Sequence, residues 1–297
     1  MDLQKLARTI LPGSALAQLR RAKWERERRR IAALPPLTEE DFKNILTGEL
    51  GVGAGDVLYV HSGIDGLNLA FPFYRILSLI REVIGAQGTV IFPTYPNHRI
   101  SSAEYLRQGN VFDVRRTPSY TGIFTEFARR QRNAVRSLHP TKSVGAIGPV
   151  AKEVTATHHL SPYPYDTVSP YYKLIENEAR IIGLGVSTDY LSFGYCVDDA
   201  LKERFPVRVY HEQVFEAPCI NYDGERVIVK TYAHDMSQVI HPDMPRFMKT
   251  HVSNEACEDL NIRGMKFFRA SAPKLFAEMM KLAEQGITTY PRSVYRK

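Results

Sequence analysis

The chain has 297 residues, of which 44% are hydrophobic and 24% are charged, and its formal net charge at pH 7 is +7. This length can bury a full core in one large domain or two small ones. No apolar run approaches the roughly 18 residues that span a bilayer, and the residues after Met1 are not typical of a secretory signal. Three widely spaced cysteines, Cys196, Cys219 and Cys257, exclude a disulfide framework and a cysteine-based zinc site. We therefore expect a cytoplasmic protein.

Residues 1–34 are predicted to form one or two amphipathic helices, broken at Pro12-Gly13 and ended by Pro35-Pro36. Seven Lys and Arg residues lie between Arg20 and Arg30. Such a run is most often a solvated helix face, and no nucleic-acid-binding module accompanies it, so we expect no nucleic-acid partner. We interpret 1–34 as a basic helical extension for weak contact with a membrane surface or a protein, and 35–297 as the functional domain.

Strands and helices alternate from about residue 35 onward. Thr38, with Asp41 in the following turn, predicts the start of a helix. The predicted elements after it are strands over 56–61, 88–93 and 180–185 and helices over 72–85, 121–132 and 173–178. This order predicts an α/β fold, with a central, largely parallel or mixed sheet flanked by helices.

The pattern changes near residue 205. Alternating residues over 207–210 and 226–230, with Asp223-Gly224 between them, predict a hairpin. A final helix is predicted over about 271–285. We therefore expect a small antiparallel C-terminal portion in the same domain.

Several common functional motifs are missing. The glycine-rich segment 51–55 precedes a strand instead of following one, so it does not fit a dinucleotide-binding loop. The sequence has no phosphate-binding loop and no Gly-x-Ser-x-Gly motif. Its nine histidines include no helical pair suited to zinc, so we expect no metal.

Two loops at predicted strand ends carry small polar residues. His61-Ser62-Gly63 follows the first strand, and Pro93-Thr94-Tyr95 follows the second. Loops at the carboxyl ends of strands form the ligand crevice in open α/β sheets. Glycine and hydroxyl residues there let backbone N–H groups approach a phosphate, although ordinary turn chemistry also explains each loop taken alone.

Five segments in order resemble one family, the aminoglycoside 3-N-acetyltransferases. The segments are 60–63, 88–95, 112–126, 136–149 and 169–186, the most specific being Arg-Ser-Leu-His-Pro at 136–140 followed by Ser143-Val144. The resemblance covers roughly residues 38–235. It implies an acetyl-CoA-dependent N-acetyltransferase.

The resemblance also implies where the co-substrate binds. Ser62, Gly63 and Ile64, next to His61, would meet the pyrophosphate or pantetheine of CoA. Thr94 would lie nearby. The Ser143-Val144 pair would bind the pantetheine amides.

The position of the catalytic base departs from the family pattern. Amine attack on a thioester needs a proton acceptor. In the family that this chain resembles, the acceptor is a His, and an acidic residue follows it three positions later. Here Asp189 matches a family Asp, but Tyr195 occupies the His position and Asp198 the acidic one. A phenol is a poor base at neutral pH.

Three explanations stay open for this departure. Another group, such as His139, His61 or Asp198, accepts the proton; or the amine arrives partly neutral; or the protein no longer catalyses the reaction. An imidazole suits neutral pH, so His139 is the first choice for the base. Asp198 would then orient it, and the Tyr195 hydroxyl would donate to the thioester oxygen.

Charge guides the expected substrate. Aminoglycosides are polycations that need carboxylates, whereas a basic chain suits an anion. Arg99, Arg115 and Arg116 are candidate phosphate contacts. We therefore expect a nucleotide-linked amino sugar, as used in surface-polysaccharide synthesis. The alternatives are an aminoglycoside, as in antibiotic resistance, and a non-catalytic CoA-binding homologue; a homodimer is compatible with each.

Overall fold

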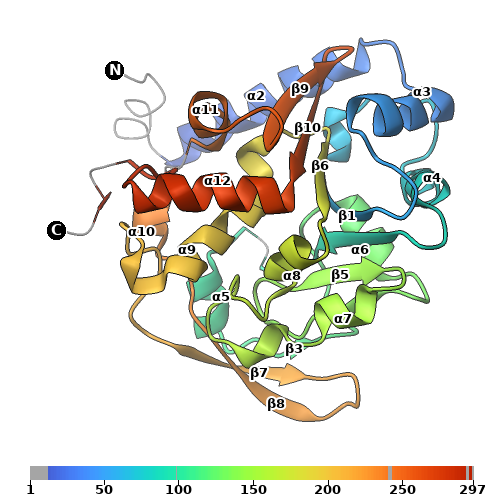
Figure 1. Cartoon of the computed structure of the whole chain (residues 1–297). Coiled ribbons are helices and arrows are strands. Elements are labelled where there is room, and N and C mark those ends of the chain that lie inside the picture. Colours follow the sequence, from blue (N-terminus) through green and yellow to red (C-terminus); the bar gives the residue numbers. More distant parts are fainter. Residues whose placement is uncertain (1–12, 98, 240–242, 292–293, 296–297) are drawn as a thin grey trace.

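A seven-stranded mixed sheet forms the centre of the protein in the computed structural model (Figure 1). The structure describes residues 13–97, 99–239, 243–291 and 294–295. In spatial order the strands are β4 (Val135–Arg136), β5 (Val144–Ile147), β2 (Thr89–Pro93), β1 (Val57–Ser62), β6 (Arg180–Leu184), β10 (Met265–Ser271) and β9 (Cys257–Ile262).

Three parallel strands lie at the middle of this sheet. β1 pairs in parallel with β2 and with β6, and the other pairings in the sheet are antiparallel. Because side chains alternate along a strand, Leu58 and Val60 of β1 pack on one face and Tyr59 on the other. The predicted mixed α/β fold is confirmed.

Helices cover both faces of the sheet. One face packs against α2 (Gly13–Ala32), α3 (Glu39–Asn44), α4 (Arg75–Ile84) and α6 (Ile123–Arg129). The other face packs against α7 (Ala151–Thr155), α8 (Pro170–Glu176), α9 (Tyr195–Leu201), α11 (Met244–His251) and α12 (Ala272–Glu284). Shorter elements are α5 (Ser102–Arg107), α10 (Met236–Val239), the π-helix η1 (Ile45–Glu49), and the 3-10 turns η2 (Ile64–Gly66), η3 (His158–Leu160), η4 (Thr188–Tyr190), η5 (Ser192–Gly194) and η6 (Lys202–Arg204).

A second sheet of three strands lies at the edge of the molecule (Figure 1). It contains β3 (Phe112–Asp113), β7 (Phe215–Ile220) and β8 (Arg226–Thr231), with β3 parallel to β7 and β8 antiparallel to it. The predicted turn at Asp223-Gly224 is confirmed between β7 and β8.

The predicted strand over 207–210 is wrong. This segment makes only two isolated bridges, Val207 with Tyr295 and Tyr210 with His234. Val207 and Val209 are buried in the main core, which accounts for their alternation without a continuous partner strand.

The predicted start of α3 is confirmed. Thr38 accepts a hydrogen bond from the backbone N–H of Asp41, whose carboxylate accepts one in return from the Thr38 N–H. Such a capping box stabilises the first turn of a helix.

The basic helix α2 lies against the body of the protein. Ile31 is buried, and Arg30 Nη1 donates to the carbonyl of Gly264 at 2.8 Å. The first of the helices predicted within 1–34 falls on residues outside the described part of the chain. Within the described part, no helix is both long and apolar enough to cross a bilayer.

Candidate functional site

The carboxyl ends of β1, β2 and β6 meet at one edge of the sheet, because these strands are parallel. The Gly63 N–H donates to the carbonyl of Leu184 at 2.9 Å. A Cβ on Gly66 would lie 2.1 Å from the carbonyl oxygen of Gly185, which itself has a φ of +71°. Only glycine permits the loops after β1 and β6 to cross this closely.

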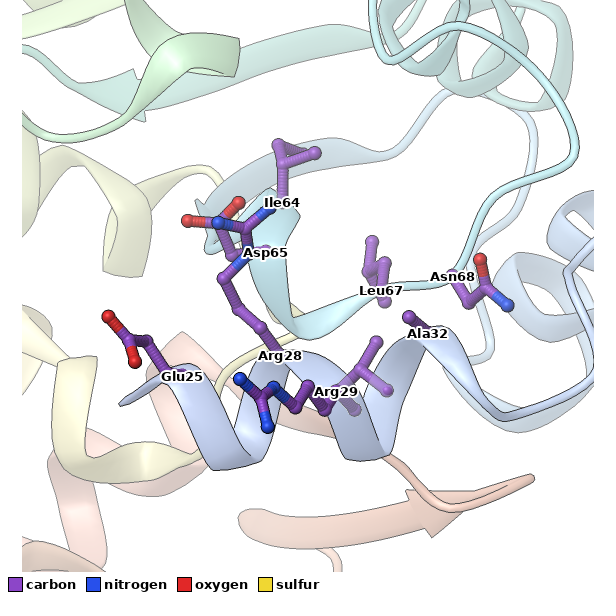
Figure 2. A pocket seen from close by; sticks show the side chains of 9 residues that line it. Glu25, Arg28, Arg29, Ala32, Ile64, Asp65, Leu67 and Asn68 are labelled. Carbon is purple, nitrogen blue, oxygen red and sulfur yellow. The ribbon is translucent and has the colours of Figure 1, made fainter. Parts of the chain in front are cut away.

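A cavity of about 380 Å³ opens beside this crossing, between α2 and η2 (Figure 2). Arg28 and Arg29 of α2 line it together with Ile64 and Asp65. Figure 2 shows the Arg28 side chain extending from α2 toward the turn that carries Ile64 and Asp65. Ile64, which the sequence assigns to the CoA loop, therefore borders a cavity lined by two arginines and by the acidic residues Glu25 and Asp65.

Thr94 and Ser143, both assigned to the CoA site from the sequence, lie in contact, but their hydroxyls form hydrogen bonds within the protein. The Thr94 hydroxyl donates to Ser143 Oγ at 3.1 Å, and Ser143 Oγ donates to the Thr94 carbonyl at 2.7 Å. The buried guanidinium of Arg136 donates to both hydroxyls and to the Thr94 carbonyl. The Val144 N–H donates to Ser137 Oγ at 2.9 Å, and the Val144 carbonyl accepts from the Ser137 N–H at 2.8 Å. Contact of these residues with pantetheine stays a prediction.

His139 has a structural environment. Its Nδ1 accepts from the backbone N–H groups of Lys142 at 3.0 Å and Thr141 at 3.3 Å. Its Nε2 lies 3.2 Å from Thr231 Oγ1, and its ring stacks on His158 at 4.3 Å. Burial first, and then the charge of His158, hold the pKa of His139 well below its usual range. Since both ring nitrogens are engaged, this geometry does not favour His139 as the base.

Several buried polar atoms have no hydrogen-bond partner among the described residues. They are His61 Nε2, Ser62 Oγ, Asn97 Oδ1, Thr141 Oγ1, Tyr165 Oη and His234 Nε2. Buried polar atoms are almost always paired, so atoms of this kind at strand-end loops indicate groups that a ligand would satisfy. Burial also lowers the pKa of His61 to about 3, so its ring is neutral.

Tyr195 and Asp198 lie one turn apart at the start of α9. Asp198 accepts from the Tyr290 hydroxyl at 2.8 Å, and burial raises the pKa of Asp198 well above its usual range. Burial, together with the charge of Asp198, also raises the pKa of Tyr195. Tyr195 therefore keeps its proton at neutral pH and can donate a hydrogen bond, but it cannot act as a base. Asp189 is exposed and accepts a hydrogen bond from the Ser187 hydroxyl.

The sequence reasoning missed His234, which contacts Tyr195. The two ring centroids are 4.7 Å apart, and His234 also stacks on Tyr210 at 4.7 Å. The isolated bridge between Tyr210 and His234 fixes the backbone here. Burial, with a smaller contribution from the charge of Lys142, holds the pKa of His234 well below its usual range. The available sequence signal was weak: a histidine three residues after a strand, outside any motif.

A cavity of about 260 Å³ is lined by Tyr210, whose ring stacks on His234, although His234 itself is not among the lining residues. Three tyrosine rings that contact one another, Tyr163, Tyr210 and Tyr232, line it. Its carboxylates are those of Asp198, Glu203 and Glu212, and its cations are Lys202 and Arg208.

The cations of this tyrosine-lined cavity are already paired. Lys202 contacts Asp166 at 3.2 Å, and Arg208 contacts Glu212. The tyrosine faces, together with the carboxylate of Glu203, suit a cationic amino sugar. Within the described residues, no group of His, Cys, Asp and Glu is arranged to hold a metal ion.

Comparison with known proteins identifies the protein family to which this fold and site belong. The aminoglycoside 3-N-acetyltransferase family matches residues 60–284. Aminoglycoside N(3)-acetyltransferase IX of Micromonospora chalcea is 27% identical over 205 residues, which cover 65% of this chain and 70% of that protein. Aminoglycoside N(3)-acetyltransferase III of Pseudomonas aeruginosa is 28% identical over 199 residues, covering 63% and 71% of the two chains.

Solved structures share the fold. The aminoglycoside acetyltransferase AAC(3)-Xa superposes with a TM-score of 0.71 at 18% identity, over 91% of this chain and 99% of that one. The binary complex of AAC-IIIb with CoASH gives a TM-score of 0.69 at 20% identity, over 86% and 99%.

The chain therefore belongs to the aminoglycoside 3-N-acetyltransferase family, as the sequence resemblance indicated. It is an N-acyltransferase with acetyl-CoA as its co-substrate. The match begins at residue 60, so α2 and α3 lie outside the matched segment.

Proposed function

We propose that the protein transfers the acetyl group of acetyl-CoA to an amino group of a cationic amino sugar of the aminoglycoside class, with His234 as the proton acceptor. The observation that carries this proposal is the buried, unpartnered Nε2 of His234, whose ring contacts Tyr195 and stacks on Tyr210, a residue of the tyrosine-lined cavity. A neutral imidazole there has a free lone pair for the proton that the amine loses.

The reaction balances with this chain's own groups. The amine nitrogen attacks the thioester carbonyl carbon, a C–N bond forms, and the amine proton passes to His234 Nε2. The Tyr195 hydroxyl, protonated at neutral pH, is a donor for the oxygen that gains negative charge. The C–S bond then breaks, and the thiolate of CoA leaves and takes up a proton.

The tyrosine-lined cavity supports an aminoglycoside over a nucleotide-linked sugar. Lys202 and Arg208 are each paired with a carboxylate, so this cavity has no uncompensated cation for a diphosphate within its described lining. The relatives named above are aminoglycoside N(3)-acetyltransferases. The nucleotide-linked amino sugar expected from global charge has no support from this cavity.

The co-substrate is proposed to enter along the strand-end loops. The unpartnered atoms Ser62 Oγ and Thr141 Oγ1 fit the amide and carbonyl groups of pantetheine, and Arg28 and Arg29 fit a phosphate at the cavity beside Ile64. The packing of α2 on η2 supports a role for the helix in this part of the site.

Release of free thiol from acetyl-CoA, measured against aminoglycosides, simple amino sugars and nucleotide-linked amino sugars, tests the proposal. We expect turnover with aminoglycosides. Turnover with the nucleotide-linked sugars alone would contradict the proposed substrate class, and no turnover with any amine would favour a non-catalytic CoA-binding protein.

The variant His234→Asn tests the base. Losing a general base typically lowers the rate roughly 100-fold to 10,000-fold, so we expect a loss of this order in kcat with little change in the Kd for acetyl-CoA. His251→Asn, at an exposed position on α11, is the matched control and should turn over normally. Normal turnover in His234→Asn would contradict this assignment.

A further inference from the structure

Six arginines line one cavity of about 590 Å³, and its described lining includes no carboxylate. The lining consists of Val114, Arg115, Arg116, Arg129, Arg130, Arg132, Ala134, Arg136 and Tyr222. We call this cavity the arginine pocket. Its arginines come from three segments, namely the loop after β3, the end of α6 with the residues that follow it, and β4.

Nearby carboxylates compensate only part of this charge. Glu126 pairs with Arg129 at 2.7 Å and with Arg130 at 2.6 Å, and Asp113 lies 4.0 Å from Arg116. Six arginines against these two carboxylates leave an excess of four positive charges. Like charges held this close repel one another, so the pocket is poised for an anion.

Contacts within the protein hold part of the pocket lining in place. Arg129 Nη1 donates to the carbonyl of Arg115 at 2.8 Å, and the Arg115 guanidinium lies 5.3 Å from the ring centre of Tyr222. The Tyr222 hydroxyl accepts from the backbone N–H of Arg136 at 2.6 Å. Burial, and next the charge of Arg129, lower the pKa of Arg136 to about 9.

We propose that the arginine pocket binds a phosphate or diphosphate group. Guanidinium groups pair with phosphate oxygens through two parallel hydrogen bonds, and several of them converging on one concavity suit a multiply charged anion. A merely solvated basic face needs no such convergence, because arginines in water reduce their repulsion by spreading apart. The proposal concerns binding and is independent of the acceptor and base assigned above.

The diphosphate has two possible sources. Arg136 connects the pocket to Thr94 and Ser143, which the sequence assigns to the CoA site, so the phosphates of CoA are one source. A separate phosphorylated ligand is the other. Both present the same chemistry to the arginines.

Titration calorimetry of the full chain with inorganic pyrophosphate tests the site. The test variant is Arg115→Glu with Arg132→Glu, two exposed arginines for which the described structure shows no ion pair. The matched control is Arg81→Glu, an exposed arginine on α4 that lies outside the pocket. We expect pyrophosphate binding to weaken at least about tenfold in the double variant and to stay unchanged in the control.

Parallel titrations with CoA and acetyl-pantetheine, which lacks these phosphates, distinguish the two sources. With pyrophosphate binding lost, a weaker affinity for CoA but not for acetyl-pantetheine supports the pocket as the site of the CoA phosphates. An unchanged affinity for CoA supports a separate phosphorylated ligand. Absence of pyrophosphate binding to the wild-type chain, or equal binding by the wild type and a folded double variant, would overturn the proposal.

Discussion

At the scale of single residues, two histidines with similarly lowered pKa values have different environments. His139 uses both ring nitrogens within the protein, whereas His234 has a buried nitrogen without a partner. A lowered pKa alone therefore does not separate a structural histidine from a candidate base. The hydrogen-bond partners do.

His139→Ala should lower the free energy of unfolding by about 1–3 kcal/mol, because it leaves the N–H groups of Thr141 and Lys142 buried without an acceptor. His139→Asn keeps an acceptor and should recover part of that loss. Urea unfolding of both variants gives the comparison. If His139→Asn folds normally but turns over more than about 100-fold more slowly, with unchanged CoA affinity, then His139 is the base that the sequence suggested.

Tyr195→Phe removes only the hydroxyl that is proposed to donate to the developing oxyanion. We expect kcat to fall less than in His234→Asn, by about tenfold to 100-fold, because one donor to the developing oxyanion is lost while the base remains. Thiol release at saturating acetyl-CoA measures this. Tyr190→Phe, at an exposed position, is the control. A Tyr195→Phe enzyme that is slower than His234→Asn would indicate that Tyr195, and not His234, handles the proton.

At the scale of elements, α2 both packs on the body of the protein and lines a cavity, although the sequence suggested a helical extension separate from the catalytic domain. Its last turns bury Ile31 and bond Gly264, and its arginines form one wall of the cavity at Ile64. A helix that is mostly solvated can still complete a site through one face.

A truncation starting at Pro35 should lower the melting temperature by roughly 5 °C, because it uncovers the apolar surface that Ile31 buries. It should also weaken acetyl-CoA binding by removing Arg28 and Arg29 from the cavity. Differential scanning calorimetry and titration with acetyl-CoA measure the two effects. A shorter deletion of residues 1–12 is the control. Unchanged stability and affinity in the longer truncation would show that 1–34 is a dispensable extension.

At the scale of the whole molecule, buried ionisable groups should make stability depend on pH. Burial lowers the pKa of four buried histidines, His61, His139, His158 and His234, and of the partly buried His159. It raises the pKa of two carboxyls, those of Asp198 and Asp199. Below pH 6.5 the unfolded chain protonates the histidines, whereas the folded chain keeps the two aspartic acids protonated.

The net sign follows from the proton count. Between about pH 6 and pH 4.5 the unfolded state gains protons on the buried histidines, and the folded state holds protons on the two buried aspartic acids; because the histidines outnumber the aspartic acids, unfolding takes up protons on balance. The free energy of unfolding should therefore fall as the pH is lowered through this range. Urea unfolding across this range tests it. His158→Gln should remove about one of the protons taken up on unfolding, so the free energy of unfolding should fall less steeply with decreasing pH. A free energy of unfolding that rises toward acid pH would contradict the prediction.

Elements whose signals are local were predictable from the sequence. The runs that became β1, β2 and β6, the Thr38 cap and the turn at Gly224 follow from apolar patterning and turn chemistry within a few residues. The ordered family segments also identified the enzyme class, because that class is encoded in short contiguous stretches.

The tertiary structure decided the candidate site. His234 lies beside Tyr195 although 38 residues separate them along the chain, and no periodicity in the sequence reports that contact. The engagement of His139 likewise depends on Thr231, and the convergence of Arg115 with Arg132 depends on how β3 and α6 pack. Local pattern determines which residues form a strand or a helix, whereas the partner that each buried polar atom finds depends on packing between distant segments.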